Sequence, residues 1–144
     1  MSRNYKEILL KELSARMPYR TKIQLTEYSD LTGEKLPNKI KILDYYILGR
    51  VQAYCKGFRK DEIKPYLYPL SSMTEEQCEE FRQVSGLDAD LDSIRQGRVS
   101  LIGDIAIDCL YDAIDWFNKN HFDYRELIPL GLAIDATGLG IYDR

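Results

Sequence analysis

The sequence predicts an α+β fold with an N-terminal helix, a small antiparallel sheet of four to five strands, and C-terminal helices packed on the sheet. Two patterns support this. Apolar residues recur at helical spacing near the start of the chain and again after Asp104, and the stretch between alternates apolar and polar residues as strands do. Closure of the curled sheet into a small barrel is one form of this prediction.

The composition predicts a single domain over residues 1–144. The chain is 44% hydrophobic and 30% charged, which suffices to bury a core. A net charge of −3 does not favour nucleic acid, although a local patch can be basic on an acidic protein. The N-terminus lacks the apolar segment of a signal peptide, and no apolar run is long enough to span a bilayer. We therefore expect a cytoplasmic protein with no membrane partner; a homo-oligomer is compatible with the sequence.

The cysteines argue against a thiolate site. Cys55, Cys78 and Cys109 are far apart and odd in number, which favours neither a disulfide framework nor zinc. The sequence also has no glycine-rich phosphate loop between a strand and a helix. We expect no metal and no cofactor.

The first elements follow from caps and alternation. Asn4 can cap a helix that ends before Pro18, since the residue before a proline avoids helical geometry. Residues 21–28 then alternate and predict a half-buried strand with Ile23 and Leu25 on one face. Residues 29–33 form a turn cluster.

Three further strands are predicted in the middle of the chain. Residues 39–43 alternate, with two isoleucines on one face. Asp44 interrupts the alternation, which we interpret as a bulge or a turn. The pattern resumes over Tyr45–Cys55 and predicts another strand. Glu62–Leu70 is strand-like, but its two prolines confine it to an edge or an extended segment.

The next helix has the clearest local pattern. Thr74 caps it, Gln77 completes a capping box, and Gly86 ends it. A short strand is predicted over residues 99–102. From Asp104 the helical period returns and continues to about Asn118.

Two alternatives remain open for residues 98–111. They form either the start of this helix or a hairpin around Gly103, in which case the helix begins near Asp112. After the helix, Asp123 is predicted to cap a second short helix that Pro129 ends or kinks, and the last residues are predicted to be a loose tail. We expect a shared apolar seam to cover the sheet, formed by Trp116, Phe117, Leu127 and Leu130.

Two groups of residues are candidates for catalysis or metal binding. His121 stands at a helix end, with Asp123 close enough in sequence to orient its imidazole for base catalysis. The aspartates Asp104, Asp108, Asp112 and Asp115 share one helix face. A structural histidine and a solvated helix face are the favoured interpretations, because no nucleophile motif and no cation-binding loop accompanies either group.

Tyrosines and basic residues in the predicted sheet are candidates for binding. Aromatic side chains mixed with cations can stack bases or anchor a protein interface, although strands also favour tyrosine for its fit to a pleated surface. The candidate binding residues are Tyr46, Arg50, Tyr54, Tyr66, Tyr68, His121, Asp123, Tyr124 and Arg125.

Three phrases together resemble a known family. They are KELSARMPY at residues 11–19, IKPYLYPLSSMTEEQ at residues 63–77, and DWFNKNHFDYRELIPLGLAIDA at residues 115–136. They resemble a family of small uncharacterised proteins of gut bacterial genomes and their phages, in which a run matching His121–Arg125 recurs. The chain departs from that family at Pro129. The resemblance implies a mobile-element accessory protein and carries no residue roles.

We expect a non-enzymatic protein-interaction module of a phage or mobile element, with an aromatic surface that binds an unknown protein. The alternative is a small-barrel protein that binds nucleic acid through its tyrosine, lysine and arginine face. A hydrolase or metal-dependent enzyme centred on His121 is the third possibility.

Overall fold

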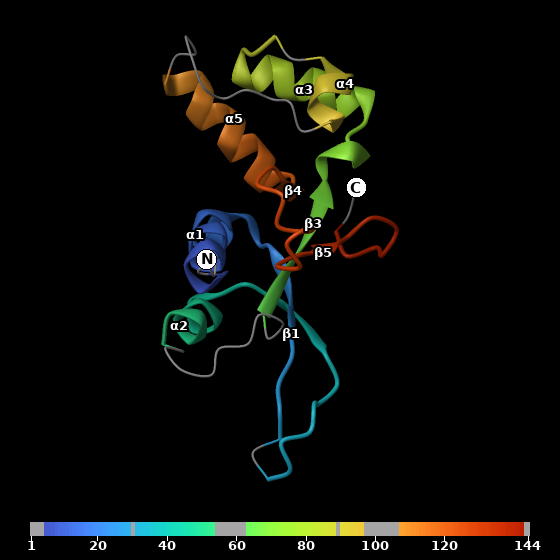
Figure 1. Ribbon diagram of the computed structural model, residues 1–144. Helices are drawn as coiled ribbons and strands as arrows, with labels where there is room; N and C mark the ends of the chain where they lie inside the picture. The colour runs from blue at the N-terminus through green and yellow to red at the C-terminus, as the bar shows by residue number, and fades with distance from the viewer. Residues whose placement is uncertain (1–4, 30, 54–62, 89, 97–106, 143–144) are drawn as a thin grey trace. The chain divides into compact units, whose positions relative to one another are not determined.

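The computed structural model describes residues 5–29, 31–53, 63–88, 90–96 and 107–142 (Figure 1). They form an α+β fold with an N-terminal helix, a mixed five-stranded sheet that is not closed into a barrel, and C-terminal helices. The chain divides into two compact units. The first unit comprises Met1–Leu67 and Leu127–Arg144, and the second comprises Tyr68–Glu126.

The first unit begins with the predicted helix α1, Tyr5–Arg16, and a 3₁₀ turn, Met17–Tyr19, that contains the proline expected to end the helix. Its Leu9 and Leu13 side chains are fully buried. They share a core cluster with Ile23 and Leu25, which are the inward residues predicted for strand β1, Lys22–Leu25. The strand therefore has the inward face that the sequence predicts, and the helix lies where the sequence predicts it.

Strand β2, Lys39–Ile42, pairs with β1 in antiparallel fashion, but its apolar face points away from the core. Residues directly opposite on paired strands share a face of the sheet. Ile40 lies opposite Gln24 and Ile42 lies opposite Lys22, whereas the two lysines of β2 lie opposite the buried Ile23 and Leu25. The predicted alternation is correct, but all four residues of β2 are exposed, and the isoleucines lie on the face away from Ile23 and Leu25.

Strand β3, Ile63–Pro69, lies inside the sheet, although its prolines predicted an edge position. The backbone N–H of Leu43 donates to the carbonyl of Thr21, so the odd-numbered residues of β1 direct their backbone groups toward β2. Ile23, which is opposite Pro65, therefore makes its ladder bonds with β2. The N–H that Pro65 lacks is not needed between β1 and β3, and the edge prediction is wrong for this reason.

The predicted strand over Tyr45–Cys55 is wrong, because helix α2 occupies Tyr45–Ala53. The Asp44 carboxylate accepts a hydrogen bond from the Ile47 N–H at 2.9 Å, which caps the first turn. The buried Leu43, Ile47 and Val51 recur every four residues, which is helical spacing. Asp44 is therefore a helix cap and not a bulge. Helix α2 packs beside α1 (Figure 1).

The tail predicted to be loose is held as far as Tyr142, while residues 143–144 lie outside the described residues. Strand β5, Ile134–Asp135, pairs in parallel with β3. The Tyr142 hydroxyl donates to the Tyr66 carbonyl at 2.8 Å and accepts from the Lys22 N–H at 2.8 Å. Lys22 and Tyr66 are the next pair in the β1–β3 register, so one hydroxyl bridges the strands where they separate.

The second unit contains helices α3, Glu75–Ser85, α4, Leu91–Arg95, and α5, Ile107–Lys119. A 3₁₀ turn, Leu70–Ser72, precedes α3, and strand β4, Phe122–Asp123, pairs in parallel with the end of β3. The capping box of Thr74 and Gln77 and the Gly86 cap of α3 are confirmed. A parallel neighbour needs a long connection, and the chain from α3 to α5 supplies one.

An aromatic cluster fixes the packing of α3 on α5 (Figure 1). Phe81 of α3 stacks on Phe117 of α5, with ring centroids 4.8 Å apart, and also contacts Trp116 at 5.3 Å. Trp116 in turn stacks on Phe122 at 5.6 Å. Aromatic pairs in such geometry stabilise a core beyond the area they bury.

Three other expectations for the C-terminal half are corrected. Residues 123–128 contain no second short helix, because Phe122 and Asp123 form β4 and Glu126 has a left-handed φ of 59°. The hairpin alternative is wrong for residues 107–111, which are helical, whereas residues 98–106 and the predicted strand over 99–102 lie outside the described residues. The predicted seam is divided, since Trp116 and Phe117 belong to the second unit, and Leu127 and Leu130 belong to a cluster in the first.

A buried ion pair lies on α1. The Arg16 guanidinium and the Glu12 carboxylate are 3.3 Å apart and both residues are at most 1% exposed. On the same helix Lys11 and Glu7 form an exposed pair at 3.8 Å. A buried pair is strongly destabilised when one partner is lost, because the other charge remains desolvated.

Replacing Glu12→Gln should lower the free energy of unfolding by about 3 kcal/mol, because the Arg16 charge stays buried without its carboxylate. The matched control Glu7→Gln, at the same spacing but in solvent, should change it by less than about 0.5 kcal/mol. Urea denaturation measures both. Equal effects from the two substitutions would contradict a special role for the buried pair.

Replacing Tyr142→Phe should lower the free energy of unfolding by about 1 kcal/mol, because the Lys22 N–H and the Tyr66 carbonyl lose their shared partner. The control Tyr45→Phe removes an exposed hydroxyl and should have no effect. Amide exchange of Lys22 provides a local readout and should accelerate in Tyr142→Phe. Unchanged exchange at Lys22 would show that the hydroxyl bridge does not hold the strand ends.

Candidate functional site

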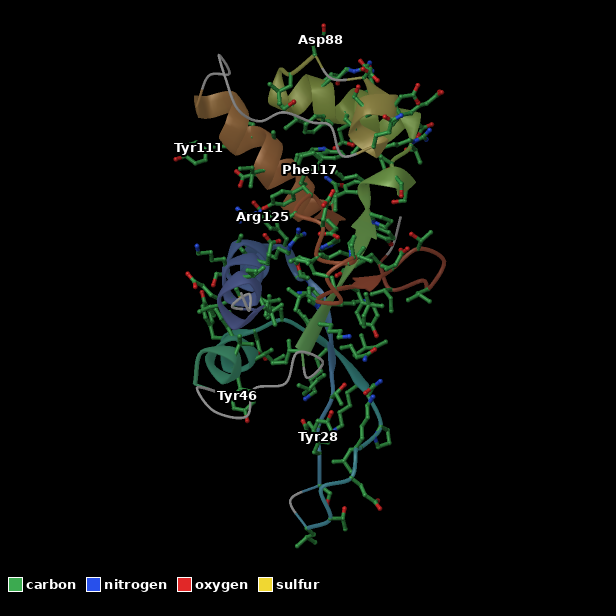
Figure 2. All side chains as sticks on the ribbon, viewed as in Figure 1. Tyr28, Tyr46, Asp88, Tyr111, Phe117 and Arg125 are labelled. Atoms are coloured by element: carbon green, nitrogen blue, oxygen red, sulfur yellow. The ribbon has the colours of Figure 1, made fainter. Side chains whose placement is uncertain are left out.

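The most exposed apolar segment of the described sheet is strand β2 with the first turn of α2. Ile40 is 55% exposed and Ile42 is 39% exposed. After the buried Leu43 and the capping Asp44, Tyr45 is 81% exposed and Tyr46 is 75% exposed. Figure 2 shows the Tyr46 side chain on the side of α2 that faces away from α1. We call Lys39–Ile42 with Tyr45 and Tyr46 the β2 edge surface.

Sequence and register explain why these side chains stay in solvent. The face of β1 that bears Ile23 and Leu25 packs on the core, so the opposite face, which holds Ile40 and Ile42, does not. Asp44 then starts α2, whose buried stripe begins with Ile47. The two tyrosines lie in the first turn, outside that stripe.

The backbone of β2 is also accessible. In the order β2-β1-β3-β4, β2 is terminal, and no described strand pairs with its outer side. Thr21 and Leu43 form a hydrogen-bonded pair, so Lys39 and Lys41 direct their backbone groups to β1. Ile40 and Ile42 therefore direct their N–H and C=O groups outward. An exposed row of such groups is a template for another strand.

The electrostatic character of this sheet differs from that of the whole chain. Strands β1, β2 and β3 contain four lysines and no acidic residue, although the chain has a net charge of −3. The nearby Asp44 carboxylate accepts the α2 capping bond. A local basic surface on an acidic protein attracts acidic partners at short range.

The tyrosines of the predicted binding face do not form one exposed surface. Tyr46 is exposed, but Tyr66 and Tyr68 are 6% and 5% exposed. The Tyr66 hydroxyl donates to Gln24 Oε1 at 3.2 Å, which places this ring on the face that carries Gln24. Tyr54 and the Arg50 side chain lie outside the described residues.

Burial raises the pKa of Tyr66 above the ordinary tyrosine value of 10.0. The cause is desolvation, which disfavours the phenolate. The pKa of Tyr66 is higher in the folded state than in the unfolded chain. Its contribution to stability is therefore fully present below pH 10.0 and is lost as the pH rises through the pKa of the folded state. Tyr66 therefore has the environment of a structural tyrosine.

The predicted run His121–Arg125 lies entirely in the second unit. His121 follows α5 with a left-handed φ of 62°, and its carbonyl accepts from the Tyr68 N–H at 2.8 Å. Asp123 is 4% exposed in β4, and Tyr124 stacks on Phe117 at 5.4 Å. The Arg125 guanidinium lies 5.6 Å from the Tyr124 ring centre, within cation–π range. Several of these contacts belong to a helix end and its packing, and a catalytic role for His121 stays a prediction.

The aspartate row is described in part. Asp112 and Asp115 are exposed on α5, while the side chains of Asp104 and Asp108 lie outside the described residues. Where side chains are described, no three His, Cys, Asp or Glu residues gather as a metal site would require.

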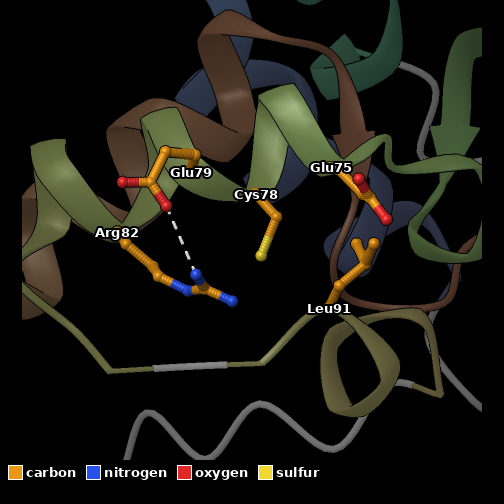
Figure 3. Close-up of a pocket in the computed structure, with 5 residues that line it drawn as sticks. All are labelled: Glu75, Cys78, Glu79, Arg82 and Leu91. Atoms are coloured by element: carbon orange, nitrogen blue, oxygen red, sulfur yellow. Dashed lines mark hydrogen bonds and ion pairs between the residues drawn. The ribbon is translucent and has the colours of Figure 1, made fainter.

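One hollow of about 300 Å³ lies beside α3 and α4 (Figure 3). It is lined by Glu75, Cys78, Glu79, Arg82 and Leu91. Figure 3 shows Glu79 and Arg82 on α3 joined by their ion pair, whose N–O distance is 3.3 Å. His121 is not among the lining residues.

Just before α4, Asp90 caps the helix, and the backbone hydrogen bond from Ser93 is the main cause that lowers the pKa of its carboxyl. The capping role accounts for the lowered pKa of the Asp90 carboxyl, and no bound ligand is needed to explain it.

No protein-family model, curated protein or solved structure matches the chain. Over the residues described, no helix has both the length and the apolar character needed to cross a bilayer.

Sequence reasoning identified Tyr46 but missed the exposure of Ile40 and Ile42. The alternation of KIKI showed that the isoleucines share a face, but not which face meets the core. The position of the isoleucines follows from the pairing of β2 with β1, in which Lys39 and Lys41 lie opposite the buried residues of β1. Only the register supplies this pairing.

Replacing Tyr66→Phe should remove the component of the tyrosinate absorbance that appears at the highest pH, because Tyr66 is shielded from solvent. A pH titration followed at the phenolate absorption band measures this. Tyr46→Phe serves as the control and should leave that component in place. A titration of Tyr66→Phe that keeps the late component would assign it to another tyrosine.

Proposed function

We propose that the protein is a non-enzymatic interaction module that binds another protein through the β2 edge surface. The proposal also places the module in the cytoplasm of a cell that carries a phage or mobile element. That setting is supported by the sequence resemblance and not by the geometry.

The observation that carries the proposal is the exposure of four large apolar side chains within seven residues, Ile40, Ile42, Tyr45 and Tyr46, on either side of the buried Leu43. Single exposed apolar residues are ordinary, but a contiguous group with a polar rim is typical of a protein-binding surface. Tyrosine is also a common anchor of protein interfaces, since it buries a large ring while keeping its hydroxyl hydrated. Lys39 and Lys41 alternate with the isoleucines and lie on the other face of the strand.

Nucleic-acid binding is the second candidate, and the four lysines of the sheet favour it. Single-stranded nucleic acid also needs exposed aromatic faces on which bases stack. Tyr66 and Tyr68 are buried and do not offer such faces. The exposed isoleucines of β2 have no role in stacking, so a protein partner explains more of the surface.

A photo-crosslinking amino acid in place of Tyr46 should form a specific protein adduct in an extract of the source organism. The matched control carries the same group at Tyr111, which is 64% exposed on α5 in the other unit. Denaturing electrophoresis followed by mass spectrometry measures the adducts. The adduct at residue 46 should disappear when Ile42→Lys is added, because a charge then replaces apolar contact area.

Equal adducts from residues 46 and 111, or an adduct at residue 46 that survives Ile42→Lys, would contradict the proposed surface. A nuclease-sensitive adduct would favour the second candidate instead.

A further inference from the structure

We infer that the partner contributes an extended segment with alternating acidic and apolar residues, which adds to the outer edge of β2 as a new strand. This inference rests on the proposed function and specifies the chemistry of the partner. It follows from the backbone of β2, its two faces and its charge.

The backbone gives the first argument. Ile40 and Ile42 direct their N–H and C=O groups away from β1, so two residues present ladder groups along one line that no described strand pairs with. Strand addition satisfies such groups with main-chain hydrogen bonds, which supply affinity without a particular side chain. A helix docking on the same edge could not satisfy them, because its own backbone groups are already bonded.

The two faces of β2 give the second argument, because they determine the sequence of the incoming strand. Its residues opposite Ile40 and Ile42 lie on the exposed apolar face, where apolar side chains are favoured. Its residues opposite Lys39 and Lys41 lie on the other face, where a carboxylate forms a cross-strand pair with each lysine. An alternation of acidic and apolar residues satisfies both faces.

Charge also disfavours a second copy of this chain as the occupant. Two β2 strands paired about Ile40 or about Lys41 place lysine opposite lysine. Like charges directly opposite on paired strands are destabilising. An acidic segment from a different protein avoids this repulsion.

The test uses the full chain and a fluorescent peptide, EVEIEVE, whose binding is measured by fluorescence anisotropy. The peptide should bind saturably. KVKIKVK, with the same apolar residues and the opposite charge, should bind at least about tenfold more weakly. EVEPEVE, which keeps all four carboxylates but lacks the central N–H that antiparallel pairing with β2 uses, should also bind at least about tenfold more weakly. An oligothymidylate should not compete with EVEIEVE.

Two variants separate backbone pairing from charge. Ile40→Pro removes an outward N–H that no described residue uses, so the fold should persist while EVEIEVE binding falls about tenfold or more. Circular dichroism verifies the fold. The double variant Lys39→Glu with Lys41→Glu should bind KVKIKVK in preference to EVEIEVE. This exchange of preference is a gain of binding that unfolding cannot produce.

The result that overturns the inference is binding that depends on charge alone. That outcome is equal affinity for EVEIEVE and EVEPEVE, an unchanged affinity in folded Ile40→Pro, or competition by oligothymidylate. The inference is also overturned if the chain forms dimers that dissociate in Ile40→Pro, because the strand added to β2 would then come from a second copy. If EVEIEVE fails to bind while the Tyr46 adduct persists, the inference fails and the proposed function survives. If the adduct is missing, the proposed function itself fails.

Discussion

The pairing of β1 with strands on both sides is the constraint on which the first unit depends. Odd-numbered residues of β1 bond to β2 and even-numbered residues face β3, while Ile23 and Leu25 enter the core. The same register accommodates Pro65 in an interior strand and turns Ile40 and Ile42 toward solvent. A shift of one residue would exchange the two faces of every strand. The exposed edge of β2 is thus a consequence of the register that builds the core.

Polar groups complete this unit where the ladder ends. The Tyr142 hydroxyl occupies the place of a direct bond between Lys22 and Tyr66, and the Asp44 carboxylate begins α2 immediately after β2. Both contacts satisfy backbone groups that would otherwise lack partners at strand and helix ends. The second unit is organised differently, since aromatic rings on α3, α5 and β4 fill its interior.

Local patterns in the sequence predicted those elements whose determinants are local. The capping box at Thr74, the proline after α1 and the helical period before Trp116 each depend on a few neighbouring residues, and all three elements are present. The strand predicted over Tyr45–Cys55 is wrong because the apolar residues there fit both the two-residue spacing of a strand and the four-residue spacing of a helix. The Asp44 cap favours the helix. The interior place of Pro65 and the outward face of Ile40 depend on partner strands distant in sequence, which alternation alone cannot reveal.

The second unit interrupts the first, since Tyr68–Glu126 is inserted between the parts of the chain that form it. During synthesis, β1, β2 and most of β3 leave the ribosome before the inserted unit, whereas β5 and Tyr142 emerge after it. The inserted unit can complete its core while the surrounding unit still lacks its closing segment. The nascent surrounding unit therefore keeps one side of β3 without its β5 partner until the segment after the inserted unit has been made.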